Sequence, residues 1–314
     1  MPTEDDRPLV LAVVGPTATG KSELGLRLAE ELGGEVVGAD ASQLYRGMDI
    51  GTAKLSVDER RGVPHHQVDV LDVTEEASVA AYQRHARADL ETVRSRGRHP
   101  VVVGGSGLYV RALLDRLEIP PTDRAVRRRI EDRAESVGTE AMYAELVAVD
   151  PDAAAVVEPG NRRRIVRALE VVELTGRPFS ATMPRREFVH PTLVLGLLPS
   201  REVLDARIAE RVRRMWAEGL LDEVRGLEAH GIRQGRTAST AIGYAQALAE
   251  LDGLLTEAQA QEQTVAATRR LARRQESWFR PDPRIRWVDP TDADAVEQAV
   301  ARVRDAVGHN GRHG

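Results

Sequence analysis

The residues best suited to chemistry stand near the start of the chain, where consecutive positions read GPTATGKS. They fit the phosphate-binding pattern G-x-x-x-x-G-K-[ST] without a mismatch. Lys21 can reach the terminal oxygens of a di- or triphosphate, and the Ser22 hydroxyl can hold Mg²⁺. The pattern predicts that a diphosphate is bound by Gly15, Pro16, Thr17, Ala18, Thr19, Gly20, Lys21 and Ser22.

The elements on either side of this stretch favour that interpretation over a glycine turn with an incidental lysine. Residues 9–14 form an apolar run typical of a buried parallel strand, and residues 22–32 carry apolar side chains at helical spacing. A strand, a glycine loop and a helix in this order direct backbone N–H groups and the positive end of the helix dipole toward a phosphate.

A carboxylate follows the second predicted strand. That strand covers residues 35–39 and is followed by Asp40, whereas the third, residues 100–103, runs into GGSG and is followed by no acid. Because ligands of open α/β sheets lie beyond the carboxyl ends of the strands, Asp40 is the acid best placed to face the phosphate loop. It can act as a Mg²⁺ relay, as a general base, or as a cap of the turn at residues 41–43. The two glycines after the third strand would let a substrate come close to the backbone.

The remaining pattern defines the fold class. Further strands are expected at residues 193–197 and 285–288, and a helix capped by Ser78 is expected at residues 78–94. The stretch 120–190 has helical patterns and no convincing strand. We therefore predict an α/β fold, with a P-loop parallel-sheet core flanked by helices and an inserted all-helical domain. The expected boundaries are 1–119 for the first part of the core, 120–190 for the insertion and 191–314 for the second, mostly helical part of the core.

Arginine is clustered in three segments although the net charge is −5. On the helix predicted for residues 161–174, arginines lie on one side and apolar residues on the other. A second helix, residues 268–280, repeats that design, with Leu271 and Trp278 on its apolar side. Such faces are either solvated basic surfaces paired with nearby acids or sites for the backbone of RNA. Two of them in a chain with a phosphate loop favour RNA.

The composition excludes several classes of protein. The 314 residues contain no cysteine, which excludes disulfides and cysteine-ligated zinc or iron–sulfur sites. No apolar run approaches the ~18 residues of a membrane span, and no signal-peptide pattern opens the chain. We therefore expect a cytoplasmic protein that contacts no membrane, and we expect it to be a monomer.

Several stretches together resemble the tRNA dimethylallyltransferases, also called tRNA isopentenyltransferases. Beside the phosphate loop, the matching stretches read ADASQLYRGMDIGTAK, VPHHQVDV, VVGGSGLYVRALL, RRIVRALEV, AIGY and TRRLARRQESWFR, and they begin at Ala39, Val63, Val102, Arg163, Ala241 and Thr268. The resemblance spans residues 9–288. It implies a P-loop core with a helical insertion that helps to hold the anticodon stem-loop of tRNA. Without the cysteine-containing zinc finger of many eukaryotic members, the chain looks like the bacterial type.

The resemblance also implies a reaction, in which a dimethylallyl group passes from dimethylallyl diphosphate to N6 of the adenosine next to the anticodon, with Mg²⁺ as cofactor. It assigns Asp40 as the general base, Lys21 as a stabiliser of the leaving diphosphate and Arg211 as a diphosphate contact. Ser106 stands where the family usually has a threonine whose hydroxyl lies near the reacting adenosine. The implied tRNA contacts are Asp40, Ala41, Ser42, Gln43, Ser106, Arg127, Arg163, Arg164, Ile165, Val166, Arg167, Arg274, Gln275, Trp278 and Arg280.

Some residues depart from this pattern or suggest other sites. Arg270 replaces a usual glutamine, and Thr240 stands where relatives often carry glutamine or arginine, which bears on fine RNA contacts and not on the reaction. His65 and His66 suggest a metal pair, but a structural role suits adjacent histidines without further ligands better.

Three other functions use parts of the same pattern: a nucleotide or small-molecule kinase, an adenylate isopentenyltransferase and a non-catalytic RNA-binding protein. The third strand, which ends without an acid, disfavours the kinase. The insertion favours tRNA over free adenylate as the acceptor. A protein that merely binds RNA has no use for Lys21, Ser22 and Asp40 together.

Overall fold

The computed structural model describes residues 7–182 and 186–310. It divides into two compact units: unit 1 comprises Met1–Leu114 and Phe188–Gly314, and unit 2 comprises Asp115–Glu187. Both borders of unit 2 lie a few residues before 120 and 190, the borders expected for the insertion.

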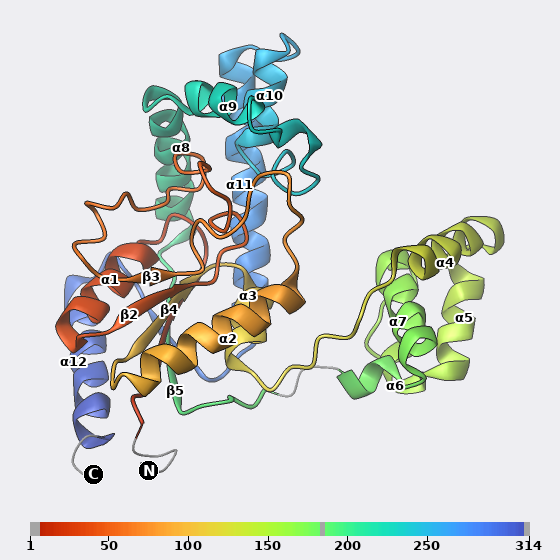
Figure 1. Ribbon diagram of the computed structural model, residues 1–314, viewed down its shortest axis with the longest axis horizontal. Coiled ribbons are helices and arrows are strands. Elements are labelled where there is room, and N and C mark those ends of the chain that lie inside the picture. The colour runs from red at the N-terminus through yellow and green to blue at the C-terminus, as the bar shows by residue number, and fades with distance from the viewer. Residues whose placement is uncertain (1–6, 183–185, 311–314) are drawn as a thin grey trace. The chain divides into compact units, whose positions relative to one another are not determined.

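Unit 1 is built on a parallel sheet flanked by helices (Figure 1). Within the described residues this sheet has six strands in the order β3-β2-β4-β1-β5-β6. The strands are β1 (Val10–Val14), β2 (Glu35–Gly38), β3 (His65–His66), β4 (Pro100–Gly104), β5 (Thr192–Leu197) and β6 (Ile285–Val288). Every neighbouring pair is parallel. The predicted fold class is confirmed, and β1, which precedes the phosphate loop, lies inside the sheet between β4 and β5.

Helices cover both faces of this sheet, so its strands carry apolar side chains in both directions. In β1, Leu11 and Val13 pack into one core with α1 and α12, whereas Val10 and Val14 pack into another with α2 and α3. The bounds of these helices are Lys21–Leu32 for α1, Val79–Ser95 for α2, Gly107–Leu114 for α3 and Ala293–Asn310 for α12. Ser78 caps α2 as predicted, because its hydroxyl accepts a hydrogen bond from the N–H of the third helical residue.

Further helices extend unit 1: α8 (Arg201–Ala217), α9 (Leu220–Glu228), the short 3₁₀ helix η3 (Ile232–Gln234), α10 (Tyr244–Leu251) and α11 (Glu257–Phe279). Of these, α8 and α11 lie side by side (Figure 1). The loop after β2 contributes Tyr45 and Met48 to their core, where these side chains join Met215, Leu220 and Tyr244. None of the helices in the described part of the chain is long and apolar enough to cross a membrane.

Unit 2 has a hydrophobic core of its own, to which Ile130, Leu146 and Leu169 belong. Its elements are α4 (Arg124–Val137), α5 (Thr139–Val149), α6 (Pro151–Ala154), α7 (Arg162–Thr175) and the 3₁₀ helix η2 (Phe179–Thr182). Polar side chains begin these helices: Asp123 accepts backbone hydrogen bonds at the start of α4, and Asn161 does so at the start of α7. A separate core is what lets such a segment fold as an inserted domain.

Candidate active site

The loop between β1 and α1 follows a path that requires glycine at two positions. Gly15 has a φ of 136°, and a Cβ atom there would lie 2.4 Å from the carbonyl oxygen of Leu197. Gly20 has a φ of 89° and is the N-cap residue of α1. Because the first N–H groups of a helix have no intrahelical partner, α1 offers free donors and the positive end of its dipole to this loop. The loop and helix have the geometry of an anion-binding cradle.

Lys21 folds back onto the loop. Its ammonium group donates a hydrogen bond to the carbonyl oxygen of Pro16 at 2.6 Å, and the same oxygen accepts one from Oγ1 of Thr19 at 2.9 Å. Burial lowers the pKa of Lys21 to about 8 against the attraction of Asp40, and the positive charge of Arg211 adds to the lowering. A bound diphosphate would act in the opposite direction, because an anion nearby favours the charged amine.

Two helices outside the sheet reach the phosphate loop at Thr17. Nη1 of Arg211, on α8, donates to Oγ1 of Thr17 at 2.9 Å, and Oε1 of Gln275, on α11, accepts a hydrogen bond from the N–H of Thr17 at 2.9 Å. Arg211 therefore lies at the loop where the sequence expects it. Gln275, expected among the tRNA contacts, is buried and supports the phosphate loop, a role that the sequence does not indicate.

Asp40 follows the carboxyl end of β2. Its Oδ1 accepts a hydrogen bond from the N–H of Ser42 at 3.0 Å, which is the turn-capping role that the sequence leaves open. Among the described residues, its Oδ2 has no hydrogen-bond partner. Capping therefore does not exclude chemistry, because one oxygen fixes the carboxylate while the other can accept a proton.

Ser106 follows β4 and lies against the segment that carries Asp40. Its Oγ accepts a hydrogen bond from the N–H of Ala41 at 3.3 Å, and its own N–H donates to the carbonyl oxygen of Ala39 at 3.3 Å. These contacts join the ends of β2 and β4 at the same edge of the sheet.

Contacts inside the protein require the glycines before Ser106. A Cβ atom on Gly104 would lie 2.2 Å from the carbonyl oxygen of Ala39, and one on Gly105 would lie 2.4 Å from Nε2 of Gln275. The protein itself therefore approaches both glycines closely, and the expected approach of a substrate stays a prediction.

Two cavities of unit 1 meet at Asp40. The first, of about 890 Å³, is lined by the phosphate loop with Lys21 and Ser22. The second, of about 500 Å³, is lined by residues that include Ser106 and Trp278. The residues that line both cavities are Thr17, Asp40, Thr52 and Arg211. A reactant on the phosphate loop can therefore meet a reactant in the second cavity beside the Asp40 carboxylate.

The segment after Asp40, which is expected to read the target base, is divided between these cavities. Ala41 and Ser42 line the second cavity, and Gln43 lines the first. Nε2 of Gln43 donates to the carbonyl oxygen of Thr52 at 3.2 Å. Thr52 itself is a residue that sequence reasoning did not select, although it lies inside the matching stretch that begins at Ala39.

Exposed residues of α11 stand at the second cavity. Arg274 and Trp278 line it, and the Trp278 ring lies 5.9 Å from Cζ of Arg111. Trp278 is 48% exposed, so the side of the helix opposite the arginines is not buried at this position. Arg280 pairs with Glu276 at 2.9 Å. An exposed ring beside cationic side chains is suited to stacking on a base.

In unit 2, the residues expected to contact tRNA fall into two groups. Ile165 and Val166 are buried in the core, so their side chains pack the unit and present no surface to RNA, in contrast to the expectation. Arg127 and Arg167 pair with the buried carboxylate of Glu170, at 2.6 Å and 2.8 Å. These four residues therefore have structural roles.

The second group consists of exposed arginines at the start of α7. Among the described residues, the guanidinium groups of Arg163 and Arg164 have no hydrogen-bond or ion-pair partner.

The paired arginines of the first group act on Glu170. Burial works against the ionisation of Glu170, but the hydrogen bonds from Arg127 and Arg167 outweigh it and hold the pKa of this carboxyl below its ordinary value. The α7 arginines thus include both structural cations and free ones.

The histidine pair has structural partners. Nε2 of His66 lies 2.7 Å from Oε2 of Glu35, and Nδ1 of His65 lies 2.8 Å from the carbonyl oxygen of Val63. Within the described residues, no group of three or more His, Cys, Asp or Glu side chains could hold a metal ion. The structural interpretation of these histidines is the one that fits.

Comparisons of the sequence with known proteins give a consistent result. A sequence model of the IPP transferase family matches residues 43–282. The tRNA dimethylallyltransferase of Streptomyces avermitilis is 57% identical over 290 residues, which cover 92% of this chain and 93% of that protein. The tRNA dimethylallyltransferase of Kineococcus radiotolerans is 59% identical over 302 residues, which cover 94% and 95% of the two chains.

Solved structures agree. The full-length tRNA isopentenylpyrophosphate transferase of Bacillus halodurans is 38% identical with a TM-score of 0.71, over 97% of this chain and 98% of that one. A eukaryotic dimethylallyltransferase seen acting on tRNA is 30% identical with a TM-score of 0.83, over 96% of this chain and 80% of that one. At these identities over nearly its whole length, the chain belongs to the IPP transferase family.

Proposed function

We propose that this protein transfers a dimethylallyl group from dimethylallyl diphosphate to N6 of the adenosine next to the anticodon of tRNA, with release of diphosphate. The observation that carries the proposal is the meeting of two cavities at Asp40, one lined by the phosphate loop and the other by Ser106 and Trp278. Relatives that share more than half of its residues are named tRNA dimethylallyltransferases, which supports the same reaction.

Asp40 is the proposed general base. The lone pair of N6 is delocalised into the adenine ring, so the amine is a poor nucleophile until its proton is removed. As the bond from N6 to the allylic carbon forms, the free oxygen of Asp40 accepts this proton, while Oδ1 stays fixed on the N–H of Ser42. The bond that breaks joins the allylic carbon to the bridging oxygen of the diphosphate, which leaves with the electron pair.

The phosphate loop is the proposed site of the leaving group. Negative charge grows on the departing oxygen, and Lys21, Arg211 and the N–H groups at the start of α1 are fixed cations and dipoles that stabilise it. The rest of the loop from Gly15 to Ser22 wraps the diphosphate. Bound substrates that fill the cavity would keep water away from an allylic carbon that water readily attacks.

Ser22 is the proposed protein ligand of Mg²⁺. It lines the first cavity beside Lys21, and no carboxylate cluster for a metal lies in the described residues. Such a site fits Mg²⁺, which commonly takes few protein ligands and fills its octahedron with phosphate oxygens and water. Bound there, the ion would neutralise charge on the diphosphate.

The tRNA contacts that we propose are the exposed members of the expected set. Arg163 and Arg164 offer unpaired cations on unit 2, and Arg274, Trp278 and Arg280 are exposed on α11 of unit 1. Residues 41–43 would contact the target base and its neighbour at the cavities, together with Ser106. We further propose that the protein works as a monomer in the cytoplasm, which light scattering and fractionation would test.

One experiment tests the function. The protein is incubated with dimethylallyl diphosphate, Mg²⁺ and unmodified tRNA, and the RNA is digested and analysed by mass spectrometry for a nucleoside heavier by one C5 unit. Parallel reactions contain free adenylate as the acceptor, or ATP with small acceptors. Transfer to adenylate but not to tRNA would contradict the proposal in favour of an adenylate isopentenyltransferase, and phosphoryl transfer from ATP would contradict it in favour of a kinase.

A further inference from the structure

The loop from residue 41 to residue 55 forms part of the wall of both cavities. Gln43 and Leu55 line the first cavity, Ser42 and Gly51 line the second, and Thr52 lines both. Apart from one isolated bridge, the loop consists of turns and irregular structure. Backbone hydrogen bonds, among them those that join Gln43, Leu44 and Arg46 to residues 69–71, set part of its shape, and side-chain contacts set the rest.

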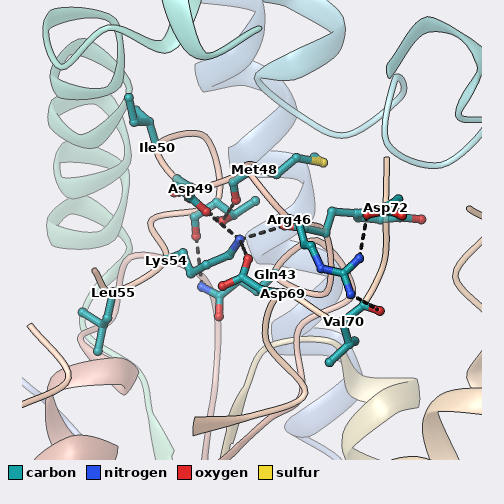
Figure 2. A network of polar contacts seen from close by, with 12 residues as sticks. Gln43, Arg46, Met48, Asp49, Ile50, Lys54, Leu55, Asp69, Val70 and Asp72 are labelled. Carbon is teal, nitrogen blue, oxygen red and sulfur yellow. Dashed lines mark hydrogen bonds and ion pairs between the residues drawn. The ribbon is translucent and has the colours of Figure 1, made fainter. Parts of the chain in front are cut away.

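Lys54 makes the first of these contacts from inside the loop. Its ammonium group lies 2.8 Å from the carbonyl oxygen of Tyr45, 2.6 Å from Oδ1 of Asp49 and 2.5 Å from Oδ1 of Asp69 (Figure 2). The side chain is 3% exposed, so three oxygens take the place of water around the ammonium. Asp69 also pairs with Arg60 at 3.4 Å. Lys54 thus connects Tyr45 and Asp49 of the loop to Asp69, which lies in the segment that follows β3.

A second contact comes from outside the loop. Oε2 of Glu223, on α9, accepts hydrogen bonds from the N–H groups of Asp49 at 3.1 Å and Ile50 at 2.7 Å. Oε1 of the same carboxylate accepts one from the Tyr244 hydroxyl at 2.5 Å. A Cβ atom on Gly51 would lie 2.4 Å from Cε2 of Tyr244, so the turn presses directly on the phenol ring. Glu223 and Tyr244 hold the tip of the loop from the helical side.

The Tyr244 hydroxyl is a permanent donor in this arrangement. Burial raises the pKa of Tyr244 above its ordinary value, and the negative charge of Glu223 acts in the same direction. The phenol therefore stays protonated at neutral pH and its hydrogen stays on Glu223. Three of the matching sequence stretches, which contain Lys54, Asp69 and Tyr244, converge on this one loop.

We propose that Lys54 and the Glu223–Tyr244 pair are positioning residues, which hold the loop in the shape that places Gln43 and Thr52 at the junction of the two cavities. The inference rests on the proposed function of that junction. The phosphate loop has separate supports, Arg211 and Gln275 on Thr17, and they do not pass through this loop. Loosening the loop should therefore weaken the productive binding of the RNA acceptor and leave diphosphate binding unchanged.

Two variants each remove the polar contacts of one side chain with little change of shape. Tyr244→Phe keeps the ring that packs on Gly51 and removes its hydrogen bond, and Lys54→Met removes the charge and keeps an unbranched chain. Arg46→Gln is the matched control, because Arg46 belongs to the same loop but forms an exposed pair with Asp72 (Figure 2).

We expect Tyr244→Phe to raise the KM for tRNA by about tenfold, the equivalent of about 1.4 kcal/mol, which is the scale of one buried hydrogen bond. Lys54→Met removes three contacts and should raise this KM at least as much. The KM for dimethylallyl diphosphate should not change, and Arg46→Gln should resemble the wild type. A merely structural role would lower kcat through a smaller folded fraction and leave both KM values unchanged, and this result would overturn the proposal.

Amide hydrogen exchange, followed in the absence of substrates, tests the same contacts independently of activity. In Tyr244→Phe the N–H groups of Asp49 and Ile50 should exchange faster, while those of β1 keep their wild-type rates. Unchanged exchange in the loop of this variant would overturn the positioning role, whatever the KM for tRNA. If the wild type transfers nothing but the exchange result appears, the proposed function fails and the loop contacts stand.

Discussion

Lys21 and Arg211 place two cationic groups at one short loop, and burial lowers the pKa of both. Because Lys21 titrates at about 8 in the free protein, its charge is sensitive to pH in the range in which enzymes are assayed. Neither group has a buried carboxylate as a direct hydrogen-bond partner: Lys21 donates to a carbonyl oxygen and Arg211 to a hydroxyl. Both cations are therefore available to an incoming anion.

The first prediction concerns this lysine. In the absence of tRNA, affinity for dimethylallyl diphosphate should be full below a pH of about 8 and should fall as the pH rises through that value, because Lys21 loses the proton that the anion attracts. Lys21→Ala should bind the diphosphate about 10- to 150-fold more weakly, as for a lost hydrogen bond to a charged group, and should show no step near this pH. Calorimetric titration between pH 7 and about 9.5 measures both effects. Affinity of the variant for tRNA should be close to that of the wild type, and an equally severe loss there would contradict the assignment of Lys21 to the diphosphate.

The second prediction separates chemistry from structure at Asp40. Asp40→Asn keeps an oxygen that can accept the hydrogen bond from Ser42, so the turn and the fold should persist. The amide cannot take a proton from N6, and kcat should fall by roughly 10²- to 10⁴-fold, with little change in the KM of either substrate. Steady-state kinetics and a thermal melt measure these quantities. A turnover rate equal to that of the wild type at saturating substrates would remove Asp40 from the mechanism.

At the scale of elements, the sequence predicts most of the sheet. The expected strands at 9–14, 35–39, 100–103, 193–197 and 285–288 each lie within one residue of β1, β2, β4, β5 and β6. A parallel strand buried on both faces is a short apolar run, and such a run needs no long-range information to be recognised. The two residues of β3 are too few for any period, and among the strands of residues 7–182 and 186–310 this is the one that sequence reasoning misses.

The contacts between elements are what the sequence cannot supply. Helical periodicity identifies an apolar side, but it does not tell what covers that side, and Trp278 on that side is 48% exposed. The hydrogen bond from Thr17 to Gln275 joins residues 258 positions apart, and no local pattern indicates it. Likewise, the family resemblance implies that Ile165 and Val166 contact tRNA, but it cannot tell a residue that contacts RNA from one that fills the core.

The third prediction concerns the two exposed arginines at the start of α7, which differ from Arg167 in having no carboxylate partner among the described residues. Arg163→Ala with Arg164→Ala should weaken tRNA binding and reduce the slope of log affinity against log salt by about 0.7–0.9 for each lost phosphate contact. Stability should hardly change, because neither guanidinium has a partner among the described residues. Filter binding at several salt concentrations gives the slope. The matched control is Arg286→Ala with Arg302→Ala, which removes the same charge from exposed positions of unit 1.

Arg167 should behave differently from these two. Arg167→Ala leaves the buried carboxylate of Glu170 with Arg127 alone as its cationic partner, and we expect unit 2 to lose about 1–3 kcal/mol of stability. Because the pKa of Glu170 is held below its ordinary value, this contribution is fully present above the pKa of free carboxyls and is lost only as the pH falls below it, through the lowered pKa of Glu170. The contradicting outcome for the third prediction is a salt plot of the Arg163/Arg164 variant that is parallel to that of the wild type, with equal affinity. It would mean that α7 merely carries a solvated basic face.

At the scale of the whole molecule, the sheet of unit 1 does not depend on the segment inserted into it. The strands β4 and β5, which precede and follow unit 2 in the sequence, both pair with β1. The chain leaves and re-enters unit 1 at one place, because the N–H of Val189 donates to the carbonyl oxygen of Leu114 at 2.8 Å. Each unit also has its own core. Insertion of a domain between paired chain ends is compatible with folding of both parts.

The last prediction follows from this connection. When residues 115–187 are replaced by a linker of a few Gly and Ser residues, unit 1 should still unfold cooperatively and should bind dimethylallyl diphosphate with the affinity of the full chain. Affinity for tRNA should fall, and the salt slope should fall at least as far as in the Arg163/Arg164 variant, since the deletion removes the same cations. Circular dichroism, calorimetry and filter binding at several salt concentrations measure the three quantities. Loss of the cooperative transition would show that unit 1 needs unit 2 to fold. Unchanged tRNA affinity would instead place all of the RNA contacts on unit 1, where Arg274, Trp278 and Arg280 would have to supply them.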